Sequence, residues 1–226
     1  DKFALASQHK AEAAIKAGRF NQEIVPLEIK TRKGSVTVET DEHPRFGATL
    51  EALSQLRPAF DKEGTVTAGN ASGINDGAFA LVIASENSVK QHGLQPLVEV
   101  VSTGQGGVAP EVMGLGPVRA IKQALTRAKL NLSDIDKVEL NEAFAAQAIG
   151  VMKSLSEQHN LEQSWFDEHV NVNGGAIALG HPIGASGGRI VTSLIYEMLR
   201  SQSQFGLASL CIGGGMGTAL VLSRYH

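Results

Sequence analysis

Two residues with acid–base or nucleophilic side chains lie in glycine-rich surroundings. His181 stands within the stretch 171–188, and Cys211, the only cysteine, precedes the glycine turn 213–217. A histidine can exchange a proton near neutral pH, a thiol can act as base or nucleophile, and the N–H groups of a glycine turn can bind an oxyanion. The two segments therefore predict proton transfer beside an oxyanion site.

The backbone around His181 is strongly constrained. Pro182 follows it and disfavours helical geometry at His181, and six glycines within the stretch permit close approach of other groups. Two structural alternatives remain open at this point. His181 can be a satisfied structural histidine whose glycines serve helix packing, and Cys211 can be an inert, buried small hydrophobic residue.

A third segment, 141–145, places Asn141 and Glu142 at the junction of a predicted strand and a predicted helix. Polar side chains at such a junction lie at the carboxyl edge of a sheet, where open α/β folds bind ligands. The alternative is that Asn141 only caps the helix.

Nucleotide-binding motifs are not supported. Residues 104–109 fit the pattern G-x-G-x-x-A after a strand, but Pro110 follows and no helix is expected to start there. No acidic residue follows at the required distance, and no G-x-x-x-x-G-K-[ST] motif occurs in the sequence. The sequence therefore argues against both a Rossmann site and a P-loop.

The elements that must position these residues alternate between strand and helix in the second part of the chain. The expected strands are 78–84, 97–102, 137–140, 170–172, 206–212 and 218–223, and the expected helices are 85–93, 118–130, 143–158 and 187–200. This order is typical of a layered α/β domain, and the final strand pair makes its sheet mixed. The first part differs, with a helix at 2–17, a hairpin of strands 23–30 and 35–39, a short helix at 49–55 and a loop at 57–76.

Composition excludes several classes of protein. The 226 residues include 20 basic and 23 acidic side chains, and a net charge of −3 does not favour nucleic acids or anionic membranes. One cysteine allows no intrachain disulfide and fits a reducing compartment, and no cysteine cluster indicates zinc. No apolar run approaches the roughly 20 residues of a membrane span. The chain begins at Asp1 without an initiator methionine, so we expect it to be a piece of a longer chain.

The three segments together resemble the signatures of the thiolase family, most closely its short-chain acetyl-CoA acetyltransferase branch. The matching stretches are Asn-Glu-Ala-Phe at 141–144, N-x-N-G-G with G-H-P-x-G-x-S-G at 171–187, and C-x-G-G-G-x-G at 211–217. The resemblance covers nearly the whole chain. It implies a thiolase-like layered α/β fold, with a mixed five-stranded sheet and helices on both faces, plus part of an α+β loop domain. Residues 1–74 then correspond to the second part of the loop domain and 75–226 to the C-terminal domain.

The resemblance also implies roles for the site residues. His181 is similar to the histidine that activates the nucleophilic cysteine and contributes to an oxyanion hole, and Asn141 to the asparagine of that hole. Cys211 resembles the second catalytic cysteine, which moves the α-proton of the incoming acetyl group. The Gly213 N–H would belong to a second oxyanion hole. Coenzyme A contacts are implied at further positions, namely Ser72, Ala71, Gly73, Arg45, Phe60, Met113, Ala143 and Phe144.

The implied reaction is thiolase-type Claisen condensation of two acetyl-CoA molecules to acetoacetyl-CoA and CoA, or the reverse thiolysis. Coenzyme A thioesters are substrates, and neither a resident cofactor nor a metal is expected. The resemblance further implies a cytoplasmic homo-oligomer, a dimer or tetramer. The alternatives are a longer-chain 3-ketoacyl-CoA thiolase and a non-catalytic CoA-binding module; a ketoacyl synthase fits the C-terminal signature less well.

The sequence departs from the family pattern in two ways. The family's nucleophilic cysteine lies in its N-terminal half, whereas Cys211 belongs to the C-terminal signature. We therefore expect the isolated chain to be inactive and its N-terminal thiolase half to be encoded in the same gene or a second chain. In addition, residues 158–169 are longer than in close relatives, and we expect a surface insertion there.

Overall fold

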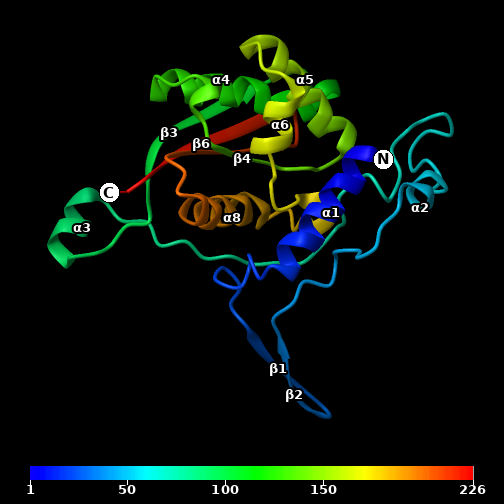
Figure 1. The fold of residues 1–226 in the computed structure, drawn as a ribbon, viewed down its shortest axis with the longest axis horizontal. Helices are drawn as coiled ribbons and strands as arrows, with labels where there is room; N and C mark the ends of the chain where they lie inside the picture. The colour runs from blue at the N-terminus through cyan, green and yellow to red at the C-terminus, as the bar shows by residue number, and fades with distance from the viewer. Residues whose placement is uncertain (226) are drawn as a thin grey trace.

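The computed structural model describes residues 1–225 and centres on a mixed four-stranded sheet (Figure 1). The sheet has the order β3-β6-β5-β4, with bounds Val98–Gly107, Met216–Arg224, Phe205–Ile212 and Lys137–Leu140. Strand β4 runs parallel to β5, and β6 runs antiparallel to both β5 and β3. The predicted mixed α/β sheet is confirmed, but it has four strands where the resemblance implied five, and two expected strands, 170–172 and 78–84, are not part of it.

The expected strand at 170–172 is reduced to one isolated bridge between Val170 and Val138. The chain turns immediately afterwards, because Asn171 adopts a left-handed conformation with φ of +46°. Its side chain takes the place of further strand pairing: Oδ1 accepts from the N–H of Leu140 at 2.8 Å, and Nδ2 donates to the Leu140 carbonyl at 2.8 Å. A side-chain amide thus satisfies the outer edge of β4, and the prediction of a strand at 170–172 is wrong.

The apolar run 78–84 was also expected to be a strand, and this prediction is wrong. The segment belongs to no strand and runs along α8 (Ser186–Ser201), where the Phe79 ring packs against Gly188 (Figure 1). Val82 and Ile83 are 97% and 86% exposed. An apolar sequence favours a strand only where a neighbour supplies hydrogen bonds, and within residues 1–225 no strand pairs with this run.

Helices cover both faces of the sheet (Figure 1). Helices α4 (Gly116–Ala128) and α5 (Ala145–His159) lie on one face, and α8 lies on the other. Alternate residues of β5 enter the two cores: Leu207 packs with the α4 and α5 side chains, and Ala208 packs with the α8 side chains. Burying one large apolar side chain in such a layer stabilises the fold by about 1.5–3 kcal/mol.

The region 158–169 is not confined to the surface. It forms the end of α5 and a short helix, α6 (Gln163–His169), whose Phe166 is buried in the core with α5 side chains. Trp165 stacks on His169, with ring centroids 4.5 Å apart. This region therefore contributes a side chain to the core, which the expectation of a surface segment did not include.

The remaining elements agree with the prediction in type and order. They are α1 (Lys2–Lys16), the antiparallel hairpin β1 (Leu27–Thr31) and β2 (Gly34–Val38), α2 (Leu50–Ser54), and α3 (Glu86–His92). Three short elements were not predicted, namely the 3₁₀ helices η1 (Pro110–Leu115) and η2 (Leu132–Asp134) and the four-residue helix α7 (Ala176–Leu179). No helix within residues 1–225 is long and apolar enough to cross a bilayer.

Close backbone packing between β3 and α4 generates the first prediction. A Cβ at Gly104 of β3 would lie 2.1 Å from the Ala120 carbonyl oxygen of α4, whereas a Cβ at Gly107 of the same strand meets nothing within 4 Å. We expect Gly104→Ala to lower the free energy of unfolding by about 2–3 kcal/mol, because backbone cannot move aside as a flexible side chain can. Chemical denaturation of the chain measures this.

Gly107→Ala is the matched control and should change the free energy of unfolding by less than about 0.5 kcal/mol. Equal effects of the two substitutions would contradict the assignment of the close approach to Gly104.

Candidate functional site

The sheet topology brings Asn141 and Cys211 to the same edge. Strands β4 and β5 are parallel with Leu140 opposite Ser209, and the N–H of Asn141 donates to the Ser209 carbonyl at 2.9 Å. Cys211 lies two residues further along β5, so both residues stand at the carboxyl ends of parallel strands. Asn141 does not cap α5, whose N-cap is Phe144, and the capping alternative is therefore wrong.

His181 meets Asn141 across this edge. The Asn141 Nδ2 and His181 Nε2 atoms are 3.4 Å apart, although 40 residues separate them in the chain. His181 reaches this position from α7 through Gly180, whose φ of +96° is a conformation that favours glycine. The structure thus joins two of the three predicted segments by a direct side-chain contact.

Ser186 determines which nitrogen of His181 carries the proton. Its Oγ lies 2.5 Å from His181 Nδ1 and donates its own hydrogen to the Pro182 carbonyl at 3.0 Å. Since the hydroxyl has one hydrogen, it accepts from Nδ1–H, and this leaves the Nε2 lone pair facing Asn141. With this hydroxyl orientation, and with Asn141 Nδ2 toward Nε2, we expect the Nδ1–H tautomer for the neutral ring.

Asn75 holds the main chain of His181. Its Oδ1 accepts from the His181 N–H at 3.0 Å, and its Nδ2 lies 3.4 Å from the Nδ1 of His43. Sequence reasoning did not assign Asn75, Ser186 or His43 to the site. Asn75 stands near the predicted Ser72, and Ser186 lies within the G-H-P-x-G-x-S-G stretch, but only the folded geometry shows what they contact.

The environment keeps His181 neutral. Burial lowers the pKa of His181, and the positive charge of Arg189 lowers it further. Both effects disfavour the imidazolium form, so the ring is unprotonated at neutral pH and able to take up a proton. His181 is therefore a histidine with a free basic nitrogen, which argues for the chemical interpretation over the structural one.

Cys211 is half-buried at the end of β5, and burial raises the pKa of its thiol. The following turn has left-handed glycines, with φ of +85° at Gly214 and +92° at Gly215. A Cβ at Gly213 would meet nothing within 4 Å, so its backbone is open to approach. Within residues 1–225, no hydrogen bond joins Cys211 to His181 or Asn141. Cys211 and Asn141 share one edge of the sheet, and His181 is joined to that edge by its contact with Asn141.

Several predicted coenzyme A residues form one group. The N–H and Oγ of Ser72 both donate to the Ala143 carbonyl at 3.0 Å, and Ala71 bridges to Phe144. The Phe60 ring meets the Phe144 ring edge-on with centroids 6.3 Å apart, and it remains 80% exposed. This group adjoins Asn141 through the chain.

The other predicted contacts are more scattered. Gly73 lies against the ring of His43. The N–H of Arg45 donates to Gln8 Oε1 on α1 at 3.0 Å, and Met113 lies in η1, which Gln147 of α5 binds through the Gly114 carbonyl at 3.2 Å. No hydrogen bond in the described part of the chain joins Arg45 or Met113 to the Ser72 group.

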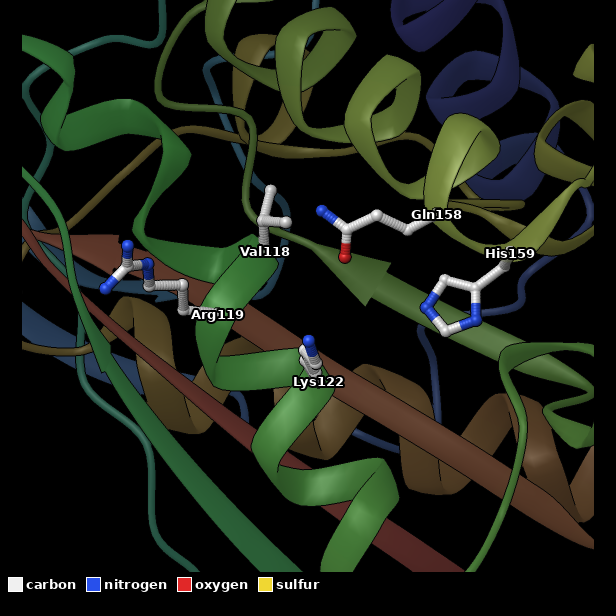
Figure 2. A pocket seen from close by; sticks show the side chains of 5 residues that line it. All are labelled: Val118, Arg119, Lys122, Gln158 and His159. Carbon is white, nitrogen blue, oxygen red and sulfur yellow. The ribbon is translucent and has the colours of Figure 1, made fainter.

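A hollow of about 340 Å³ lies elsewhere, between α4 and the end of α5 (Figure 2). Figure 2 shows the Gln158 amide and the His159 ring extending from α5 toward α4, where Val118, Arg119 and Lys122 complete the lining. None of the predicted site residues lines it. Across residues 1–225, no group of three His, Cys, Asp or Glu side chains could hold a metal ion.

Comparisons with known proteins agree with the signatures. The family model described as the thiolase C-terminal domain matches residues 94–224, and the thiolase N-terminal domain model matches 1–87. The acetyl-CoA acetyltransferase of Rhizobium meliloti (strain 1021) is 57% identical over 224 residues, which are 99% of this chain and 55% of that protein. The acetyl-CoA acetyltransferase of Escherichia coli (strain K12) is 56% identical over 227 residues, covering 100% of this chain and 55% of that protein.

Solved structures show the same relationship. The Bacillus anthracis acetyl-CoA acetyltransferase superposes with a TM-score of 0.92 at 46% identity, and human mitochondrial 3-ketoacyl-CoA thiolase with 0.91 at 48%. Each match covers 100% of this chain and 55% of the other. The chain thus spans about half the length of its relatives. It contains sequence from both thiolase domains, which corrects the expectation that a second chain could supply the N-terminal half: part of it is here.

The His181 tautomer generates a second prediction. Imidazole ¹⁵N NMR of the chain should show the Nδ1–H form in the wild type. Ser186→Ala removes the acceptor for that hydrogen and should give a mixture with the Nε2–H form. Ser193→Ala is the matched control, since Ser193 lies on the same helix and donates to Glu23 Oε2 at 2.9 Å instead. An unchanged tautomer in Ser186→Ala would contradict the assignment.

The raised thiol pKa generates a third prediction. At pH 7.5, iodoacetamide should modify Cys211 more slowly than a free cysteine, because burial raises the pKa of the thiol and lowers its thiolate fraction. The rate of modification should still increase with pH above the range in which ordinary thiols ionise. Mass spectrometry of timed samples measures this, with urea-unfolded chain as the control.

Proposed function

This chain belongs to the thiolase family, and we propose that it is the part of an acetyl-CoA acetyltransferase that carries the proton-transfer groups. The proposed reaction is Claisen condensation of two acetyl-CoA molecules to acetoacetyl-CoA and CoA, and the reverse thiolysis. The observation that supports it best is the contact of Asn141 with the unprotonated Nε2 of His181. A neutral imidazole with an unprotonated Nε2 suits proton uptake, and the Nε2–H group formed in this way, with the Asn141 amide, suits oxyanion binding.

We assign the steps as follows. His181 Nε2 accepts the proton of the attacking thiol, and the thiolate attacks the acyl thioester carbonyl. The Cys211 thiol gives its proton to the departing coenzyme A thiolate, which leaves as CoA and makes Cys211 a thiolate. The Cys211 thiolate then removes a proton from the α-carbon of the second acetyl group, and the resulting carbanion attacks the acyl thioester carbonyl. The nucleophilic cysteine leaves as a thiolate and takes back the proton held by His181. Asn141 and His181 stabilise one developing oxyanion, and the Gly213 N–H stabilises another.

We further propose that coenzyme A lies against the group formed by Ser72, Ala71, Phe144 and Phe60. The exposed Phe60 ring offers a flat apolar surface beside Phe144, and the main chain of 70–72 already packs along 143–145. Arg45 is proposed at the phosphate and adenine end, with Gly73, Ala143 and Met113 lining the thioester arm. These assignments rest on the family resemblance together with the observed grouping.

The nucleophilic cysteine is proposed to lie outside these 226 residues, because the only cysteine here belongs to the C-terminal signature. The exposed apolar run 78–84 supports this proposal: Val82 and Ile83 present side chains that would be covered by further thiolase sequence. The relatives contain such sequence, since this chain matches 55% of their length.

Short-chain specificity is the preferred form of the proposal, since the relatives at 56–57% identity are acetyl-CoA acetyltransferases. A longer-chain 3-ketoacyl-CoA thiolase is the second candidate, supported by the structural match to the human mitochondrial enzyme. A non-catalytic module is disfavoured because Asn141, His181 and Cys211 are all present. Homo-oligomeric assembly, a cytoplasmic location and the lack of a resident cofactor remain proposals carried by the resemblance alone.

Turnover assays test the proposal. The purified 226-residue chain should show no thiolysis of acetoacetyl-CoA, whereas a longer product of the same gene that includes the missing thiolase sequence should be active. In that longer protein, His181→Ala should lower kcat roughly 10²–10⁴-fold, the usual contribution of a general base. His159→Ala, in the hollow between α4 and α5, is the histidine control and should leave kcat unchanged.

Turnover by the isolated chain would overturn the missing-nucleophile proposal. Comparable kcat for His181→Ala and His159→Ala would overturn the assigned base.

A further inference from the structure

Glu142 follows Asn141 directly, but its side chain points into the protein and is only 2% exposed. Three donors from three separate segments converge on its carboxylate. Ser7 Oγ of α1 donates to Oε2 at 2.7 Å, Asn171 Nδ2 donates to Oε1 at 2.8 Å, and the Ile177 N–H donates to Oε2 at 3.3 Å. Sequence reasoning assigned this residue no role.

The direction of these bonds requires an acceptor at position 142. Ser7 donates its hydrogen to Glu142 and accepts from the Gly175 N–H at 3.0 Å, so its oxygen already serves as an acceptor elsewhere. The Ile177 N–H can only donate, and the Asn171 Oδ1 is already bound to the Leu140 N–H. Burial raises the pKa of Glu142, and the donors from Ser7, Asn171 and Ile177 oppose that effect.

Gly175 packs directly against the carboxylate. A Cβ at this position would lie 2.2 Å from the Glu142 carboxyl carbon, so the two segments touch without room for any side chain. Six residues later the same segment reaches His181, through α7 and Gly180. Glu142 is therefore hydrogen-bonded to the segment that leads to His181, and a peptide bond joins it to Asn141.

We propose that Glu142 is a positioning residue that sets the separation of Asn141 and His181. Their 3.4 Å contact lies near the limit of a hydrogen bond, so a small shift of either loop would break it. The inference rests on the proposed function for its catalytic meaning, but the geometry can be tested without turnover.

Loss of positioning and loss of charge at Glu142 should shift the pKa of His181 in opposite directions. Three groups act on the His181 ring: Asn141 contacts Nε2, Ser186 contacts Nδ1, and the positive charge of Arg189 lowers the pKa. Removing the Glu142 charge leaves Arg189 less compensated, which would lower the pKa of His181 or leave it unchanged. Loss of the Asn141 donor removes a bond to the neutral ring, which raises the pKa.

The experiment follows the His181 pKa by NMR in the 226-residue chain carrying Glu142→Gln. This substitution puts an NH₂ group where donors already converge. We expect the His181 pKa to rise by at least about 0.5, because the bond that favours the neutral ring is lost. Glu139→Gln is the matched control: Glu139 is buried on β4, and burial raises its pKa to about 8, so glutamine resembles its neutral form. The control should leave the His181 pKa as in the wild type.

Ser7→Ala is the second variant, used together with Glu142→Gln or in its place if that protein does not fold. It removes the link between Glu142 and the Gly175 N–H and should raise the His181 pKa by a smaller amount. A folded variant, Glu142→Gln or else Ser7→Ala, whose His181 pKa is unchanged or lower overturns the inference. Because the readout uses the isolated chain, its result stands whether or not the proposed acyl transfer is found.

In the longer gene product, Glu142→Gln should lower kcat at least about tenfold with KM within about twofold, as expected when only transition-state contacts are lost. An unchanged kcat there, with a raised His181 pKa in the chain, would overturn the catalytic importance of the positioning. Absence of activity in the unmutated longer protein would instead count against the proposed function.

Discussion

The pairing of the Asn171 side-chain amide with the main chain of Leu140 is the constraint on which the site depends. It ends β4 by supplying both a donor and an acceptor at 2.8 Å, and the same Nδ2 also reaches the carboxylate of Glu142. If a strand continued at this edge, residue 171 and the residues after it would run along the sheet. Because the side chain takes the place of the strand, the main chain is free to turn toward the glycine segment that leads to His181.

Glycines serve two different physical purposes in this architecture. At Gly175, Gly104 and Gly188, any Cβ would collide with a carboxylate, a helix backbone or an aromatic ring, so these glycines allow close packing between segments. At Gly180, Gly214 and Gly215, positive φ values allow the chain to turn at the edge where Asn141, His181 and Cys211 stand. The glycine-rich composition therefore reflects both layer spacing and site geometry.

The electrostatic environment of the site favours the neutral forms of His181 and Cys211. Burial lowers the pKa of His181 and raises the pKa of the Cys211 thiol, so neither residue is charged at neutral pH. An uncharged pair suits the proposed reaction, in which charge develops on thioester oxygens and moves transiently through the side chains. The carboxylate of Glu142 stays out of this region and acts through hydrogen bonds to backbone and side chains.

The sequence by itself determined the family, the order of the elements and the identity of Asn141, His181 and Cys211, because short motifs at fixed spacing reflect local backbone and chemical requirements. The hairpin, α1 and the strand–helix alternation also followed from local patterns, and Ser85 caps α3 at the start of the helix expected over 85–93. Only the tertiary structure decided the number of strands, since 78–84 and 170–172 have strand-like composition but no ladder of hydrogen bonds. It alone showed that Ser186 and Asn75 contact His181, and that buried Glu142 accepts hydrogen bonds from three separate segments. Their partners lie elsewhere in the chain or on a neighbouring turn, and local pattern does not encode which buried donor meets which acceptor.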